Sequence, residues 1–279
     1  MTKVVSIFNM KGGVGKTTLT LHLAYDLADR LGKRVLIVDF DPQANASEGL
    51  LDAAAYKSHK TNKLTVSDLF SETRSTLSPV AAGAAQPLPD LDELVCRARD
   101  FRNAGFVDLA PADIYLSNIL ERARGSSLDQ RLSAVLAGKK SRYDFVLIDC
   151  GPTYSVLSNN ALRASDHVLI PVVPDSYAAK GIPILLKKIV EYNNNIPVAQ
   201  QVKVLGIVFM KVADSVIHQT SIRSEILREH RNVFQNSIQL SISYQRAALS
   251  SRTVFEIGKV RSGVKQNFQE LTDEFMRRV

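Results

Sequence analysis

Short apolar runs recur along the chain, and segments with the periodicity of a helix lie between them. The apolar runs are continuous, which is typical of strands that are buried on both faces of a parallel sheet. They occupy residues 4–8, 35–38, 106–111, 143–149, 166–174 and 204–210. Helical periodicity predicts helices over residues 19–31, 114–123, 128–136, 182–192 and 217–231. This alternation predicts an α/β fold, a doubly wound, mostly parallel sheet with helices on both faces.

The region from about residue 51 to residue 103 lacks this regular alternation. Its segment 78–89 is rich in small residues and interrupted by prolines, which predicts a long surface loop. We interpret residues 71–103 as a surface insertion that contains this loop. The chain shows no internal repeat, and its 279 residues are enough for one large domain, so we expect 1–279 to form a single domain.

A glycine-rich segment, MKGGVGKTT at residues 10–18, separates the first apolar run from the first helical pattern. Glycines allow backbone N–H groups to approach phosphate oxygens, and the positive end of the following helix favours the same anion. A plain glycine turn accounts for the glycines but not for Gly-Lys-Thr-Thr at the start of a helix. The segment therefore predicts the phosphate-binding loop of a nucleotide site. The expected nucleotide-binding residues are Lys11, Gly12, Gly13, Val14, Gly15, Lys16, Thr17 and Thr18.

Acidic residues come at the ends of two apolar runs. Asp39 and Asp41 follow the second run, and Asp149 ends the fourth. Because ligands bind at the carboxyl ends of strands in open α/β sheets, we expect these acids beside the glycine loop. Thr17, Asp39 and Asp149 are the candidate residues for Mg²⁺ and its water shell. Lys16 is expected to reach the β/γ-phosphates, and Asp41 to orient the attacking water. A turn at Asp39 and Asp41, and a helix N-cap at Asp149, are the structural alternatives.

The glycine loop departs from the ordinary phosphate-binding pattern, because Met10 stands where the first glycine would be and Lys11 follows it. A second lysine ahead of the glycines marks the deviant Walker A loop of a P-loop NTPase. The chain therefore resembles the ParA/MinD superfamily of dimeric ATPases, and the ParA branch in particular. Asp-x-Asp-Pro-Gln at residues 39–43 resembles the first switch of that family, and Cys-Gly-Pro-Thr at 150–153 resembles the second. The resemblance covers nearly the whole chain.

The resemblance implies a slow ATPase that dimerises with ATP and Mg²⁺ and acts as a switch. It implies that Lys16 serves the subunit's own ATP, while Lys11 reaches the nucleotide of the partner subunit, so Lys11, Lys16 and Asp41 are the expected catalytic residues. The homodimer is expected to bind DNA non-specifically and to position or segregate plasmid or chromosomal DNA. A ParB-like centromere-binding partner is expected to stimulate hydrolysis. ATP is expected rather than GTP, because the family uses ATP and the chain lacks an Asn-Lys-x-Asp guanine motif.

The formal net charge of +7 suits a polyanionic partner, and most of the excess lies in the last quarter of the chain. Residues 243–265 contain a run of Lys and Arg in which Glu256 is the only acid, which favours a phosphate-facing surface. Residues 217–231 also carry arginines, but interleaved glutamates are equally typical of a solvated helix face. The candidate DNA contacts are Arg223, Arg246 and Arg252.

Other functional classes remain open at this stage. A MinD-like membrane-cycling regulator would use an amphipathic C-terminal anchor, whereas residues 268–276 carry three acids and favour a docked terminal helix. An iron–sulfur ATPase would need cysteine ligands at a dimer axis, whereas Cys96 is solitary and Cys150 falls within the expected nucleotide site. A ParA-like protein that positions a protein cargo is also compatible with the motifs.

The beginning of the chain and its cysteine content predict a cellular location. The first strand starts almost at once, so we expect no signal peptide and no N-terminal helix-turn-helix of the kind with which some ParA forms bind an operator. Two cysteines far apart in sequence favour a reducing compartment over a disulfide framework. We therefore expect a cytoplasmic, nucleoid-associated protein with no membrane partner and no repressor role.

Overall fold

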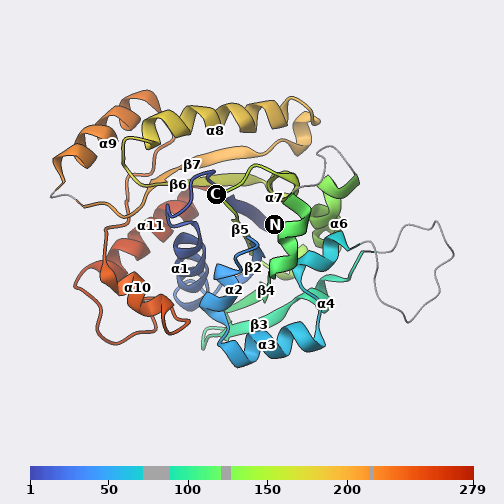
Figure 1. The fold of residues 1–279 in the computed structure, drawn as a ribbon. Helices are drawn as coiled ribbons and strands as arrows, with labels where there is room; N and C mark the ends of the chain where they lie inside the picture. The colour runs from blue at the N-terminus through green and yellow to red at the C-terminus, as the bar shows by residue number, and fades with distance from the viewer. Residues whose placement is uncertain (72–87, 121–126, 214–215) are drawn as a thin grey trace, which may run out of the picture.

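The computed structural model describes residues 1–71, 88–120, 127–213 and 216–279 (Figure 1). A seven-stranded sheet forms its centre, in the strand order β3-β4-β2-β5-β1-β6-β7. All neighbouring strands are parallel except β3 and β4, which are antiparallel. The strands are β1 (Lys3–Ile7), β2 (Arg34–Phe40), β3 (Cys96–Asp100), β4 (Phe106–Ala110), β5 (Phe145–Cys150), β6 (His167–Val172) and β7 (Lys203–Phe209). The mostly parallel α/β sheet that the apolar runs predict is confirmed.

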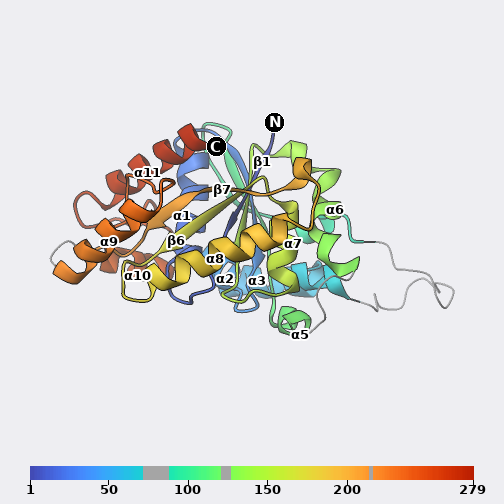
Figure 2. The ribbon, with the colours of Figure 1, turned by 90° about the horizontal axis from the view of Figure 1, so that it is seen from above.

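Helices cover both faces of this sheet (Figures 1 and 2). On one side lie α1 (Lys16–Asp29) and α11 (Val264–Arg278), and on the other α6 (Arg131–Ala137) and α7 (Val156–Ala164). The other α-helices are α2 (Asn45–Leu50), α3 (Ala53–Asn62), α4 (Leu91–Leu94), α5 (Ser117–Leu120), α8 (Ala178–Asn193), α9 (Ile217–Glu229) and α10 (Ile242–Ala248). Short 3₁₀ helices cover Val66–Phe70, Ile114–Leu116, Ser127–Gln130, Lys140–Arg142 and Val198–Gln200.

The apolar face of α1 joins the sheet to the C-terminal helix. Leu19, Leu23 and Leu27 recur every four residues, so they lie on one side of the helix, and all three are fully buried. Phe268 and Phe275 of α11 are buried in the same core. The docked terminal helix that the sequence predicts is therefore confirmed. Among the helices that the structure describes, none has the length and apolar character needed to cross a membrane.

Part of the expected insertion is regular structure. Residues 91–100, within the predicted insertion 71–103, form α4 and the edge strand β3. The sequence did not predict β3, because CRARD alternates partly exposed charged residues with small ones and contains no apolar run. Most of the predicted loop 78–89 lies outside the described residues. The helix predicted over 114–123 begins as a 3₁₀ turn, and only its residues up to 120 are described.

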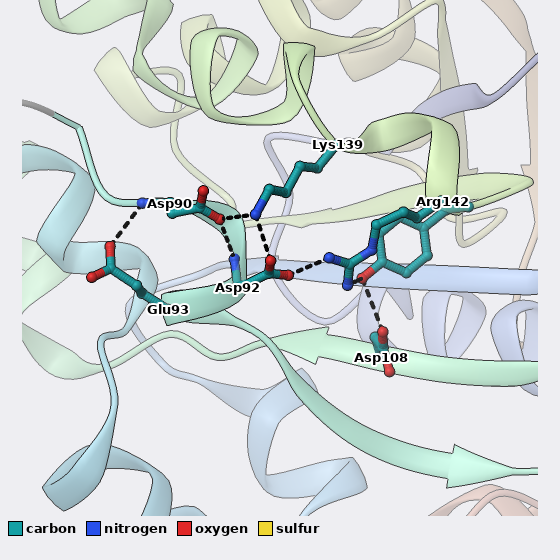
Figure 3. A network of polar contacts seen from close by, with 7 residues as sticks. Asp90, Asp92, Glu93, Asp108, Lys139 and Arg142 are labelled. Carbon is teal, nitrogen blue, oxygen red and sulfur yellow. Dashed lines mark hydrogen bonds and ion pairs between the residues drawn. The ribbon is translucent and has the colours of Figure 1, made fainter.

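A network of ion pairs and hydrogen bonds holds α4 against the segment before β5 (Figure 3). Lys139 and Arg142 both pair with Asp92 in the first turn of α4. The Tyr143 hydroxyl donates to the buried carboxylate of Asp108 on β4, with an oxygen–oxygen distance of 2.9 Å. The ion pairs thus join α4 to the segment before β5, and the Tyr143 hydrogen bond joins that segment to β4.

Candidate nucleotide site

An open cleft of about 1040 Å³ lies at the carboxyl end of β1. Its walls come from the glycine loop, the first turns of α1, the segment around α2 and α3, and α10 with the turn that follows it. Elements from both ends of the chain therefore meet at the position where open α/β sheets bind ligands. The residues of the loop that line the cleft are Gly12, Gly13, Gly15, Lys16, Thr17 and Thr18.

The conformation of the loop depends on its glycines. Gly13 has a φ of +74° and Gly15 a φ of +95°, in the left-handed region that side chains disfavour. A Cβ atom at Gly15 would also lie 3.2 Å from the Cε atom of Met210. The turn into α1 therefore packs directly on the chain that follows β7.

Lys16 lies at the start of α1 and points back across the loop. Its ammonium donates to the carbonyl oxygen of Lys11 at 3.1 Å, and the residue is 7% exposed. Burial lowers the pKa of Lys16, although Asp149 and Asp41 oppose that shift. A buried cation at the mouth of a helix is suited to an anionic ligand such as a phosphate chain.

Asp149, at the end of β5, lies directly against the first turn of α1. One carboxylate oxygen accepts from the Thr17 hydroxyl at 2.8 Å, and the other from the Thr20 hydroxyl at 3.1 Å. Asp149 is fully buried, so burial raises its pKa, and the neighbouring carboxylate of Asp39 raises it further. The structure thus brings together two of the three predicted metal residues, Thr17 and Asp149.

Asp39 is the third predicted metal residue. It lies beside Asp149 in the register of the neighbouring parallel strands β2 and β5. One of its oxygens accepts from the backbone N–H and the hydroxyl of Ser47, at 2.8 and 2.7 Å, and the other from the Asp41 N–H at 3.2 Å. Asp39 therefore fixes the start of α2 and the first switch segment. The turn role that the sequence left open is present, and a metal role stays a prediction.

The donor set around Thr17 fits a magnesium ion. Mg²⁺ is usually held by one or two carboxylates together with phosphates and waters. Thr17 and Asp149 offer a hydroxyl and a carboxylate at the same point beside the loop. Within the described ranges, no group of three His, Cys, Asp or Glu side chains is placed to hold a metal by itself. The residues therefore suit a metal that is bound together with a nucleotide.

The two switch segments lie next to each other. Asp41 is 7% exposed, and its carboxylate accepts from the Gln43 N–H at 3.0 Å. A Cβ atom at Gly151, in the second segment, would lie 3.5 Å from the carboxyl group of Asp41. Asp41 is thus held at the cleft wall, beside the segment that follows β5.

The side chain of Lys11 contacts the segment after β6, although its carbonyl oxygen accepts from the Lys16 ammonium. Its ammonium forms an ion pair with Asp175, just after β6, and lies 5.2 Å from the centre of the Tyr177 ring. Its backbone N–H donates to the side chain of Asn9 at 2.9 Å. Lys11 and Asp175 are both partly exposed, at 40% and 36%. The side chain can therefore leave this pair without uncovering a buried charge.

The three candidate DNA residues differ in their surroundings. Arg252, in the turn after α10, is exposed and lines the nucleotide cleft. Arg246, on α10, is exposed and donates to the Lys259 carbonyl at 3.2 Å. Arg223 belongs to α9 and is half-buried, with its guanidinium 5.4 Å from the centre of the Phe209 ring. The cleft thus includes Arg252 but neither Arg223 nor Arg246.

Three residues at the site were missed by sequence analysis: Ser47, Asp175 and Lys211. Ser47 holds Asp39, Asp175 pairs with Lys11, and Lys211 donates to the carbonyl of Gly13. Asp175 and Lys211 follow the carboxyl ends of β6 and β7, so the rule that placed Asp39 and Asp149 at the site also applies to them.

Comparison with known proteins gives the family. The protein-family profile described as an AAA domain matches residues 2–204. The chain is 35% identical over 191 residues to the sporulation initiation inhibitor protein Soj of Bacillus subtilis, which covers 68% of this chain and 65% of that protein. It is 30% identical over 250 residues to the chromosome-partitioning ATPase Soj of Treponema pallidum, which covers 90% and 86% of the two chains.

A solved structure shares the fold. A plasmid partition protein of Borrelia burgdorferi bound to AMPPNP superposes with a TM-score of 0.76 at 20% identity, over the whole of both chains. The profile match over residues 2–204 includes the glycine loop, Asp41 and Asp149. The chain therefore belongs to the ParA/Soj family of partition ATPases, within the ParA/MinD superfamily.

Proposed function

We propose that this ATPase is a nucleotide-dependent dimerising switch that binds DNA non-specifically and thereby positions or segregates plasmid or chromosomal DNA. The observation that carries the proposal is the shared cleft: Arg252, a candidate DNA contact, lines the same cleft as the phosphate-binding loop. A change of nucleotide in that cleft can therefore alter the position of Arg252, which is expected to contact DNA.

ATP and Mg²⁺ are the ligands that the loop suits. Lys16 supplies a positive charge for the β/γ-phosphates. The amides of the loop and of the N-terminal turn of α1 supply N–H donors. Thr17 and Asp149 would hold the metal, which neutralises phosphate charge when it is bound. Asp41 orients the attacking water, and its place at the cleft wall supports that role.

Lys11 acts across the dimer in this proposal. Its ammonium pairs with Asp175 in the single chain and must leave that pair to reach the nucleotide of the partner subunit. An ion pair between partly exposed side chains contributes about 1 kcal/mol or less, so exchanging it for a phosphate contact costs little. ATP therefore favours the dimer by offering Lys11 a stronger anion.

DNA binding follows from dimerisation, because the dimer presents each cation twice. Arg246 and Arg252 are exposed and lie close in sequence, whereas Arg223 packs on Phe209 and has less freedom to reach a phosphate. Phosphate contacts carry no sequence information, so the affinity should depend strongly on salt and little on sequence. A ParB-like centromere-binding partner would stimulate hydrolysis and release the DNA; family membership is the support for that partner.

A salt titration of DNA binding tests this function. Wild type, Arg246→Glu, Arg252→Glu and the control Lys203→Glu are compared on two unrelated duplexes, with ADP and with a non-hydrolysable ATP analogue. Lys203 is an exposed cation at the start of β7, the end of that strand away from the cleft. Its substitution therefore changes the net charge alone. We expect binding with the analogue only, and equal weakening of both duplexes by the two arginine variants.

Each lost phosphate contact should reduce the magnitude of the slope of log affinity against log salt by about one. Both subunits of the dimer carry the substitution, so one variant can lose two contacts. The Lys203 variant should keep the wild-type slope. A wild-type protein that binds neither duplex with the analogue would overturn the DNA function. Unchanged affinity in both arginine variants would remove α10 and its turn from the DNA surface.

A further inference from the structure

Lys211 reaches the phosphate-binding loop from the far end of the sequence. It follows β7 directly, and its ammonium donates to the carbonyl oxygen of Gly13 at 2.7 Å. It also lines the cleft, although it belongs to none of the segments that match a nucleotide motif. The contact gives the loop a second lysine partner, besides Lys16 on the carbonyl of Lys11.

The contact fixes the orientation of one peptide group. The carbonyl of Gly13 and the N–H of Val14 belong to the same planar trans peptide, so they point in opposite directions. When Lys211 holds the carbonyl, the Val14 N–H must point away from Lys211. In the described part of the chain this N–H donates to no protein acceptor, and the flanking residues Gly13 and Gly15 line the cleft.

The backbone around Lys211 is held in an unfavourable conformation. Lys211 has a φ of +55°, in the left-handed region where lysine is disfavoured relative to glycine or asparagine. Hydrogen bonds on both sides hold it there: the Met210 N–H donates to the Val172 carbonyl at 2.8 Å, and the Val212 N–H to the Ile238 carbonyl at 2.9 Å. Such strain persists where the surroundings impose it, and it is concentrated at functional sites.

We propose that Lys211 is a positioning residue of the phosphate-binding loop: it orients the Gly13–Val14 peptide so that the Val14 N–H faces the phosphates of the bound nucleotide. The inference rests on the proposed nucleotide function and names a residue outside the Walker loop that this function needs. Because Lys211 acts through a loop peptide, it affects the binding of any polyphosphate, whatever base or terminal phosphate that ligand carries.

Calorimetry with three ligands tests this role. ADP, a non-hydrolysable ATP analogue and inorganic pyrophosphate are titrated into wild type, Lys211→Met and Lys211→Asn. Methionine keeps the length of the side chain without its charge, and asparagine suits the left-handed backbone. Lys57→Met is the matched control, because Lys57 lines the same cleft from α3. We expect both Lys211 variants to bind all three ligands about tenfold more weakly, and the control to bind as wild type.

An amide signal gives a direct readout of the peptide itself. The chain contains two Gly–Val pairs, Gly13–Val14 and Gly263–Val264. Labelling with ¹³C-carbonyl glycine and ¹⁵N-valine therefore selects two amides, of which the second, at the start of α11, is an internal control. In the Lys211 variants without ligand, the Val14 amide should shift and the Val264 amide should not.

The outcomes separate the inference from the function on which it rests. Wild-type affinity in both Lys211 variants, or an unmoved Val14 amide, would overturn the positioning role while leaving the nucleotide site intact. An equal loss in Lys57→Met would reduce the effect to cleft charge and overturn it as well. A loss for the two nucleotides but not for pyrophosphate would place Lys211 at the nucleoside instead. A wild type that binds none of the three ligands would overturn the nucleotide function itself.

Discussion

Buried ionisable side chains surround the phosphate-binding loop, and each is held by a specific partner. Lys16 bonds the loop backbone, Asp149 bonds two threonines of α1, and Asp39 bonds Ser47. A charge out of water is costly unless it is hydrogen-bonded or paired. A charged ligand in the cleft would therefore give these buried groups a further partner.

Asp41→Ala should separate nucleotide binding from hydrolysis. The side chain lies at the cleft wall and accepts from the Gln43 N–H, so its loss removes the carboxylate that is expected to orient the attacking water but none of the loop donors. We expect ATP turnover to fall about 100-fold or more, with ATP affinity and dimer formation retained. Phosphate release and calorimetry measure the two effects. Glu229→Ala, at an exposed position of α9, is the control. Wild-type turnover in Asp41→Ala would rule out the role.

His22 of α1 is a buried neutral histidine in the wall of the cleft. Its Nε2 accepts from the Val254 N–H at 3.0 Å, so the proton is on Nδ1, which donates to the Thr18 carbonyl at 2.8 Å. Burial lowers the pKa of His22 from 6.5 to about 4. In the unfolded chain, the pKa returns to its ordinary value.

The pKa of His22 therefore makes stability depend on pH. Between about pH 6.5 and 4 the unfolded chain binds the extra proton, so the free energy of unfolding falls as the pH falls through this window. The loss attributable to His22 is about 3 kcal/mol when the window has been crossed. Urea unfolding of wild type and His22→Gln at pH 7 and pH 4.5 isolates it. The stability advantage of wild type should shrink at the lower pH; a constant difference would contradict the prediction.

At the scale of elements, Arg99 ties the edge strand β3 to two other segments. Its guanidinium pairs with Glu256 at 2.8 Å and donates to the carbonyls of Leu50, at the end of α2, and Ser251, beside Arg252. The turn that carries a candidate DNA contact is thus fixed by a strand from the region that the sequence suggested was an insertion.

Arg99→Met should destabilise the protein by about 2 kcal/mol, because it leaves Glu256 unpaired and two carbonyls without this donor. The matched control is Arg34→Met, which breaks the exposed pair with Asp144 and should cost about 1 kcal/mol or less. Urea unfolding measures both values. Equal costs for the two variants would show that Arg99 is an ordinary surface ion pair.

At the scale of the whole molecule, the site is expected to be completed by a second copy. Within one chain the ammonium of Lys11 pairs with Asp175, while its carbonyl oxygen accepts from the Lys16 ammonium. A trans role gives this lysine a phosphate partner. In the dimer, Lys11 would then exchange its carboxylate partner Asp175 for a phosphate.

Lys11→Ala should therefore remain monomeric with a non-hydrolysable ATP analogue, whereas wild type dimerises. Asp175→Asn, which releases Lys11, should dimerise at a lower protein concentration than wild type. Light scattering after size-exclusion chromatography, with ADP as the reference state, measures the mass of each. A Lys11→Ala dimer as stable as the wild type would remove the trans role.

Local patterns in the sequence predicted most of the fold and the residues at the centre of the candidate site. Continuous apolar runs identified six of the seven strands, because a strand buried on both faces must be apolar throughout. The apolar runs did not identify the edge strand β3. It lies at the edge of the sheet, and its sequence CRARD is mostly charged and partly exposed. The glycine loop and the acids Asp39, Asp41 and Asp149 were found because the order of residues there is itself the signal.

The sequence by itself thus determined the sheet, the phosphate loop and the acids at its strand ends. Only the tertiary structure decided which distant groups support them: Lys211 on the Gly13 carbonyl, Val254 on His22 and Ser251 on Arg99. Each of these pairs joins segments more than a hundred residues apart. A strand or a glycine loop is specified by neighbours along the chain, whereas a contact between distant segments is specified by the packing of every element between them.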